Sequence, residues 1–283
     1  MTKPSSTLGK VYLVGAGPGA ADLITLRGAK LLEQADIVFH DALVEPEMLE
    51  LCPQAIKVAV GKRCGKLSSA QQFINKRLVD AAQQHQVIVR LKGGDPMLFG
   101  RADEEIQALK AAGIGVEVVP GITAALAGAA SIEKSLTLRG ISRSVAFVTL
   151  AHAHGSSGEN PVAGTPISNP SADTLVYYMG RKDASKIAAE LIALGKSHHP
   201  ETPVKILEAV STSRERLWDG TLAQLASGKA DDWFDSSSPA LIMVGEALRS
   251  KTKDAVINSK SSCPKVNNGL QDSQILSNSR RRA

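Results

Sequence analysis

Residues 93–101 combine a carboxylate with unusually bare backbone. They read Gly-Gly-Asp-Pro-Met-Leu-Phe-Gly-Arg and follow an apolar run at 87–92. Two glycines let the backbone approach a ligand closely or take a positive φ, and Pro96 keeps Asp95 out of helical geometry. If 87–92 is a strand of a parallel sheet, Asp95 lies at its carboxyl end, where open α/β sheets bind small molecules. The stretch therefore predicts a ligand-binding loop.

A second glycine-rich loop, at residues 15–19, also follows an apolar run. Its spacing partly fits the G-x-G-x-x-G/A pattern of dinucleotide-binding folds, and Asp41 falls about where a ribose-binding acid would be expected. However, Pro18 and Gly19 occupy the place where the phosphate-binding helix should make its first turn. We expect that helix only from residue 23, with Asp22 as its N-cap. A nicotinamide-dependent oxidoreductase is therefore an alternative, but not the favoured one.

The elements that must position these loops alternate between strand and helix over residues 10–120, which predicts a mainly parallel sheet. We expect strands at 11–15, 36–40, 56–60, 87–91 and 116–119, and helices near 23–34, 45–51, 69–84 and 102–112. A helix of very small side chains begins at Ala124. A long Gly-, Ser-, Pro- and Asn-rich loop covers 155–173.

The pattern of strands and helices continues beyond residue 136. Further strands are expected at 145–150, 174–180, 204–209 and 240–244, with a helix at 183–195 and an extended segment at 214–221. The expected fold class is α/β with two domains, 10–134 and 135–249. Each is predicted to be a mixed, mainly parallel sheet flanked by helices, and the ligand site is predicted in the cleft between them.

Composition restricts the possible functions. The chain has 283 residues, 43% of them hydrophobic, with 33 basic and 28 acidic side chains. Eight of the basic and two of the acidic ones lie from Arg249 onward, so the remainder holds 25 and 26. We expect 1–9 to be a flexible N-terminus and 250–283 a disordered basic tail. Binding of nucleic acid by this tail is possible but not favoured.

The sequence contains no pattern typical of a membrane span, a secretory signal or a metal site. No apolar run is long enough to cross a bilayer, and the first residues have no apolar core. The three cysteines are widely spaced and odd in number, which is typical of a reducing cytoplasm. The histidine pairs 152/154 and 198/199 have no nearby carboxylate or cysteine to complete a metal site. We therefore expect a cytoplasmic protein without a metal and without membrane or nucleic-acid partners.

Seven motifs in order over about residues 9–248 carry a family resemblance. They are Val-Gly-Ala-Gly-Pro-Gly at 14–19, Asp-Ala-Leu-Val at 41–44, Gly-Lys-Arg at 61–63, Arg-Leu-Lys-Gly-Gly-Asp-Pro with Phe-Gly-Arg at 90–101, Val-Val-Pro-Gly-Ile-Thr-Ala at 118–124, Tyr-Met-Gly at 178–180 and Val-Gly-Glu at 244–246. In these motifs the sequence resembles the tetrapyrrole methylases, specifically members that methylate uroporphyrinogen III at carbon.

The resemblance implies a two-domain homodimer that uses S-adenosylmethionine and releases S-adenosylhomocysteine. It implies two successive methylations of uroporphyrinogen III, which give precorrin-2 for siroheme or cobalamin synthesis. Bifunctional relatives carry a further N-terminal domain for dehydrogenation and ferrochelation. Because the motifs here begin near residue 10, we expect a methyltransferase only. A methyltransferase of a later corrin intermediate is the main alternative.

The resemblance also implies roles for individual residues. Asp41 is expected to be the proton acceptor and Lys62 the proton donor, although a salt bridge between two loops would need the same pair. The residues expected to bind the cofactor are Pro18, Gly93, Gly94, Asp95, Leu98, Thr123, Ala124, Met179, Val210 and Ala240. The cations expected to bind substrate carboxylates are Arg63, Arg101, Arg139 and Arg181, because guanidinium groups suit carboxylates.

Three positions depart from the family pattern. His40 replaces a tyrosine that is common in the family, and Ala42 replaces an arginine, which removes one candidate contact to a substrate carboxylate. Val210 replaces a glycine, so we expect at best a backbone contact with the cofactor there.

Overall fold

The computed structural model of the protein describes residues 8–60, 67–150, 169–195 and 198–250. Two of the predicted site residues, Lys62 and Arg63, lie outside the described residues, as do His152, His154 and most of the predicted loop 155–173. The described residues up to Arg249 form one compact unit, and all elements described below belong to it.

The first sheet is parallel throughout, as its alternating pattern predicts. Its strands run in the order β3-β2-β4-β1-β5, so that β4 lies at the centre. The strands are β1 (Lys10–Gly15), β2 (Ile37–His40), β3 (Ile56–Ala59), β4 (Val87–Lys92) and β5 (Val116–Val119). Because all five strands point the same way, the loops at 15–22, 41–45, 93–101 and 120–123 lie at one edge of the sheet.

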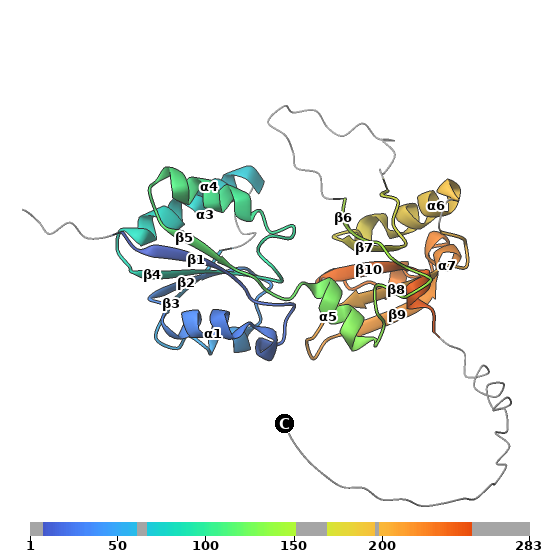
Figure 1. Ribbon diagram of the computed structural model, residues 1–283, viewed down its shortest axis with the longest axis horizontal. Coiled ribbons are helices and arrows are strands. Elements are labelled where there is room, and N and C mark those ends of the chain that lie inside the picture. Colours follow the sequence, from blue (N-terminus) through green and yellow to red (C-terminus); the bar gives the residue numbers. More distant parts are fainter. Residues whose placement is uncertain (1–7, 61–66, 151–168, 196–197, 251–283) are drawn as a thin grey trace, which may run out of the picture. The chain divides into compact units, whose positions relative to one another are not determined.

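Helices cover both faces of this sheet (Figure 1). Leu78 and Leu109, from α3 and α4, pack with one face, and Leu32 and Met48, from α1 and α2, pack with the other. The four helices are α1 (Leu26–Glu33), α2 (Pro46–Leu49), α3 (Leu67–Ala82) and α4 (Ala102–Ala111).

The first helix begins later than the sequence analysis expected. Residues Ala21–Leu23 form a 3₁₀ turn, and the N-cap of α1 is Thr25, whose hydroxyl accepts a hydrogen bond from Gly28 N at 3.1 Å. The predicted N-cap, Asp22, is therefore wrong. Asp and Thr are both good N-caps, and it is Thr25 that has the extended backbone such a cap requires, with φ −69° and ψ 148°.

The second sheet is mixed, in the order β6-β7-β10-β8-β9. The pairing of β6 with β7 is parallel and the other three pairings are antiparallel. The expectation that this sheet is mainly parallel needs correction, because β10 inserts between β7 and β8 and runs against both. Its strands are β6 (Val145–Thr149), β7 (Thr174–Tyr178), β8 (Pro203–Glu208), β9 (Arg216–Thr221) and β10 (Ala240–Gly245).

Three helices pack on the second sheet. Ile187 of α6 (Ala184–Leu194) and Leu225 of α7 (Leu222–Ala226) share one core with the sheet, and α5 (Ala124–Ser131) lies in the other. The small residues of α5 pack with β7, β8 and β10, although the sequence analysis placed this helix in the first domain. Within the described part of the chain, no helix is both long and apolar enough to span a bilayer.

Candidate functional site

Three loops at the carboxyl edge of the first sheet meet through glycine backbone. Gly94 N donates to Gly17 O at 2.7 Å, and Gly17 N donates to Gly94 O at 3.2 Å. A Cβ added to Gly121 would overlap the carbonyl oxygen of Gly94, and one added to Gly15 would lie 2.6 Å from Gly121 Cα. Gly94 also has a positive φ of 68°. Close approach therefore requires glycine at Gly15, which ends β1, and at Gly121, after β5, and the positive φ favours it at Gly94, after β4.

The carboxylate of Asp95 shapes this junction. Its Oδ2 accepts a hydrogen bond from Gly121 N and its Oδ1 accepts one from Met97 N, both at 2.8 Å. Asp95 thus ties the loop after β4 to the loop after β5. Each oxygen has a further lone pair, so the predicted contact of Asp95 with the cofactor stays a prediction.

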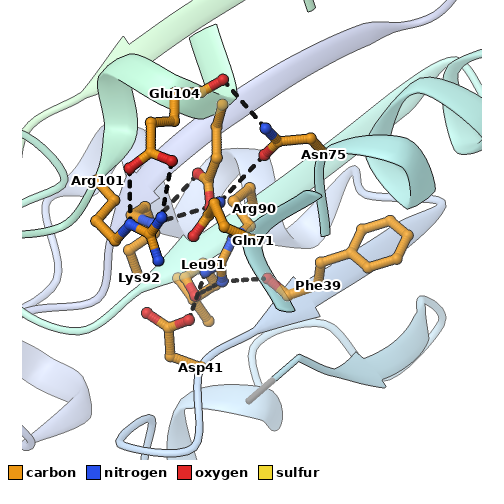
Figure 2. Close-up of polar contacts among 10 residues, drawn as sticks. Phe39, Asp41, Gln71, Asn75, Arg90, Leu91, Lys92, Arg101 and Glu104 are labelled. Atoms are coloured by element: carbon orange, nitrogen blue, oxygen red, sulfur yellow. Dashed lines mark hydrogen bonds and ion pairs between the residues drawn. The ribbon is translucent and has the colours of Figure 1, made fainter. Parts of the chain in front are cut away.

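Asp41 follows β2 and is held by an arginine of the central strand. Arg90 Nη2 donates to Asp41 Oδ1 at 2.5 Å, as Figure 2 shows. The Arg90 side chain is 3% exposed, whereas that of Asp41 is 32% exposed. Within the described residues, no hydrogen bond to Asp41 Oδ2 is found. Asp41 therefore presents one engaged oxygen to the protein interior and one accessible oxygen.

A buried carboxylate of α4 organises the charges behind Asp41. Glu105 is fully buried, and its Oε1 accepts hydrogen bonds from Arg90 Nε, Lys92 Nζ and Gln71 Nε2, each at 3.1 Å. Its Oε2 accepts a further one from Lys92 Nζ at 3.2 Å. Buried charges are tolerated only when paired and hydrogen-bonded. Glu105 meets this requirement for both cations.

Burial and the neighbouring charges act in opposite directions on these cations. Burial lowers the pKa of Lys92, and the Arg90 guanidinium lowers it further. For Arg90, burial also acts to lower the pKa, but Asp41 and Glu105 together raise it. Arg90 therefore stays charged within the cluster.

The network extends to Arg101, one of the predicted substrate-binding arginines. Arg101 Nε and Nη2 each donate to the Glu104 carboxylate at 2.7 Å. Glu104 O accepts from Asn75 Nδ2 at 3.3 Å, and Gln71 Nε2 donates to Asn75 Oδ1 at 3.1 Å (Figure 2). A chain of polar contacts thus connects Arg101 to Glu105 and Asp41.

The other two predicted substrate-binding arginines that the structure describes, Arg139 and Arg181, lie apart from this network. Arg139 is exposed in the segment between α5 and β6. Arg181 Nη1 donates to the carbonyl oxygens of Asp235 at 2.5 Å and Ser238 at 3.3 Å. The substrate contacts of both stay predictions, and the described contacts of Arg181 organise the chain around residues 235–238.

The end of β7 meets the start of α5. The hydroxyls of Thr123, the N-cap of α5, and Tyr178 lie 2.5 Å apart, and Tyr178 Oη accepts from Ala125 N at 3.2 Å. The ring of Phe99 is tilted against that of Tyr178, with centroids 5.1 Å apart. Met179 is 56% exposed and has a φ of 56°. Positive φ at non-glycine residues is strained and concentrates at functional sites, and Phe99 and Arg101 share it.

The remaining predicted cofactor residues have varied surroundings. Gly93 is exposed, and a Cβ there would meet only Leu43, at 3.6 Å. Val210 is 4% exposed, and its carbonyl oxygen would lie 3.0 Å from a Cβ on Gly19, the neighbour of Pro18. Half-buried positions are found for Pro18, Leu98, Ala124 and Ala240. The cofactor roles of all of these stay predictions.

The sequence analysis quoted Arg90, Lys92 and Tyr178 as parts of motifs but gave none of them a role, and it missed Glu105. A signal for the first two was present. Arg90 and Lys92 are two residues apart in β4, so they lie on the same face of an otherwise apolar central strand. Two charges buried in such a strand require an acidic partner. Among the described residues, no group of three or more His, Cys, Asp or Glu side chains could hold a metal ion.

The chain combines a parallel sheet with a glycine junction, a mixed second sheet, and a carboxylate, Asp41, that Arg90 holds at a strand end. The family model for Tetrapyrrole (Corrin/Porphyrin) Methylases matches residues 10–226, and the chain belongs to this family.

Particular relatives are named more narrowly. The chain is 44% identical over 241 residues to the uroporphyrinogen-III C-methyltransferase of Pseudomonas aeruginosa PAO1, covering 85% of this chain and 95% of that protein. It is 43% identical to the siroheme synthase of a Psychrobacter species, covering 86% of this chain and 48% of that protein. The chain thus spans about half the length of the siroheme synthases it matches.

Solved structures show the same fold. The uroporphyrin III C-methyl transferase of Thermus thermophilus matches with a TM-score of 0.69 and 38% identity, covering 85% of this chain and 94% of that one. A second structure of the Thermus protein, with the same scores, is complexed with S-adenyl homocysteine. A cobalt precorrin-4 methyltransferase matches with a TM-score of 0.66 and 27% identity.

Proposed function

We propose that this chain is an S-adenosylmethionine-dependent C-methyltransferase that methylates uroporphyrinogen III twice, giving precorrin-2 for siroheme or cobalamin synthesis. The strongest support is the 44% identity to a uroporphyrinogen-III C-methyltransferase. The chain covers 95% of the length of that protein. The T. thermophilus neighbour with bound S-adenyl homocysteine supports the choice of methyl donor.

The residues at the carboxyl edge fit such a donor. Gly93 leaves its backbone open, because a Cβ there would find only ordinary contact with Leu43. The exposed side chain of Met179 offers a soft apolar surface. We propose that the donor is held by Pro18, Gly93, Gly94, Asp95, Leu98, Thr123, Ala124, Met179, Ala240 and the backbone of Val210. Asp95 also keeps the loops in place. When bound, S-adenosylmethionine supplies a methyl group on a sulfonium sulfur.

Asp41 is our candidate for the proton acceptor of the reaction. Its Oδ1 is occupied by Arg90, while Oδ2 is accessible on a side chain that is about one third exposed. As a carboxylate, Asp41 can take up the proton that the macrocycle loses after methylation, through Oδ2. We keep Lys62, which lies outside the described residues, as the proposed proton donor. Arg63, Arg101, Arg139 and Arg181 are the proposed partners of the substrate carboxylates.

The test is a product mass. Purified protein is incubated anaerobically with uroporphyrinogen III and S-adenosylmethionine, and the tetrapyrrole is analysed by mass spectrometry. We expect a gain of two methyl groups. If the protein binds S-adenosylmethionine but the tetrapyrrole gains no methyl group, the proposed methyl donor stands and the proposed substrate is wrong. If S-adenosylmethionine does not bind, both proposals are wrong.

A second candidate is methylation of a later corrin intermediate. This alternative is supported by the structural similarity to a cobalt precorrin-4 methyltransferase that is 27% identical to the chain. The same mass assay with precorrin substrates separates the two, because only the true substrate gains methyl groups at a catalytic rate.

The family resemblance also supports a homodimer in the cytoplasm. Light scattering coupled to gel filtration tests the first proposal, since a dimer would show twice the chain mass of 29.8 kDa. Fractionation of cells and detection of the protein with an antibody test the second.

A further inference from the structure

Arg90 divides its N–H groups among three kinds of acceptor. Nε donates to Glu105 Oε1 at 3.1 Å, and Nη1 donates to the carbonyl oxygens of Leu91 at 3.1 Å and Phe39 at 3.4 Å. Only Nη2 donates to Asp41, and only to its Oδ1. A guanidinium and a carboxylate commonly pair through two parallel hydrogen bonds. Here the pair has one.

The single bond follows from the orientation of the guanidinium. An arginine fork can present either Nε with Nη2, or Nη1 with Nη2, to a carboxylate. Glu105 binds Nε and the two carbonyls bind Nη1, so neither pair of donors is available to Asp41. Because Glu105 is fully buried and Arg90 is 3% exposed, water does not readily replace these partners.

Resting on the proposed function, we propose that Glu105 is a positioning residue for Asp41. By holding Arg90 Nε, it limits Arg90 to one hydrogen bond with Asp41 and so leaves Asp41 Oδ2 for the substrate. Without an acceptor at position 105, the guanidinium turns and pairs with both oxygens of Asp41. The accessible oxygen is then consumed, although neither Asp41 nor Arg90 has been changed.

Two matched double variants test this role. Removing Glu105 alone would leave Lys92 as a buried cation without its partner, so both variants also carry Lys92→Met. The first is Lys92→Met/Glu105→Gln, whose amide oxygen can still accept from Arg90 Nε. The second is Lys92→Met/Glu105→Leu, which cannot. The two have the same net charge, and only the first carries an amide oxygen at position 105 that can accept from Arg90 Nε.

We expect the glutamine variant to retain kcat within about threefold of the protein with Lys92→Met alone, and the leucine variant to lose about tenfold or more, since small misplacements of a reacting group have large effects on rate. The KM for the tetrapyrrole and the affinity for S-adenosylmethionine should change less than kcat. Thermal unfolding of each variant confirms that the assayed protein is folded. Equal kcat in the two folded variants would overturn the proposal.

Crystal structures of the two variants give a readout that does not depend on the substrate. We expect Arg90 to contact both oxygens of Asp41 in the leucine variant and one oxygen in the glutamine variant. If Arg90 keeps its single contact in both, the proposal is wrong, whatever the enzyme methylates. If the structures differ as expected but the unchanged protein methylates no uroporphyrinogen III, only the proposed function fails. The control is Asp103→Asn, which changes an exposed acid on the same helix. It should alter neither kcat nor the contact between Arg90 and Asp41.

Discussion

At the scale of single residues, the site depends on how each carboxylate is engaged. Asp95 uses both oxygens, one within its own loop and one to join that loop to the loop after β5, whereas Asp41 uses one and keeps the other accessible. An aspartate therefore has a structural role after β4, as Asp95, and a proposed chemical role after the neighbouring strand β2, as Asp41.

Replacement of Asp41 by asparagine tests that chemical role. An amide cannot accept the proton, and general base catalysis typically contributes about 10²–10⁴-fold, so we expect kcat to fall by about that factor. The affinity for S-adenosylmethionine, measured by calorimetry, should change little. Glu47→Gln, on the exposed surface of α2, is the control and should leave kcat unchanged. Native kcat in Asp41→Asn would exclude Asp41 as the proton acceptor.

The sequence predicted the candidate residues of the site better than their partners. Gly-Gly-Asp-Pro after an apolar run is a local signal, so the loop after β4 was found directly. The pairing of Arg90 with Glu105 is not local: the two lie 15 residues apart on a strand and a helix. Which turn of α4 faces β4 is decided by packing against the sheet, and the sequence pattern does not specify it.

At the scale of elements, the carboxyl ends of β1, β4 and β5 work as one unit. Gly15, Gly94 and Gly121 bring three backbones into contact, and Asp95 holds two of them together. The rigidity of this junction should set both the stability of the first sheet and the shape of the proposed donor site.

Gly121→Ala should disrupt the junction. Its Cβ would overlap the Gly94 carbonyl oxygen, and a backbone atom cannot move aside as a flexible side chain can. Overpacking typically costs about 1–3 kcal/mol, and we expect the free energy of unfolding, measured with urea, to fall by at least that much. The matched control is Gly115→Ala, whose Cβ would meet only Lys10 Cγ at 3.7 Å. A Gly121→Ala protein as stable as this control would contradict the argument.

The turn after 231–233 should make stability depend on pH. Hydrogen bonds from Ser237 N, from the Ser237 hydroxyl and from the Ser238 hydroxyl lower the pKa of Asp235 to about 2. Because this value lies below the ordinary 3.8, the stabilisation is fully present above about pH 4 and is lost as the pH falls towards 2.

The urea midpoints of the unchanged protein and of Asp235→Asn should therefore differ at pH 7 and converge near pH 2. Asp232→Asn, a change to an exposed neighbouring carboxylate, is the matched control for the loss of one negative charge. A difference between the Asp235 pair that is as large at pH 2 as at pH 7 would show that the carboxylate charge is not its cause.

The strand directions show which part of the fold the local sequence pattern does not predict. Alternating strand and helix predicts parallel neighbours, and this holds for the first sheet. In the second sheet, β7 and β8 are joined through α6 but are not adjacent, because β10 lies between them. A strand from the end of the chain can insert at any edge or gap that its apolar faces fit, and the local pattern does not encode that choice.

At the scale of the whole molecule, net charge is unevenly distributed. From Arg249 onward the chain holds eight basic and two acidic residues, while the rest holds 25 and 26. The described structure is anchored up to this point, because Arg249 O accepts from Lys134 Nζ at 3.1 Å and Arg249 Nη2 donates to Glu201 O at 3.1 Å.

Deletion of residues 251–283 should leave methyl transfer intact. All the described contacts of the proposed site lie before this point, so we expect kcat and KM within about twofold of the full chain, because changes away from packed features have small effects. Retention on heparin should fall, because a block of positive charge is removed. Loss of methyl transfer on deletion would instead assign a catalytic role to the tail.

The glycine junction has a consequence for inheritance. Every amino acid other than glycine carries a Cβ, so no missense change in the codons for Gly15 and Gly121 is conservative. A saturation library selected for growth that depends on this enzyme should retain only synonymous codons at these two positions, while accepting several amino acids at Gly115. Over generations the two codons should therefore drift in their third base alone.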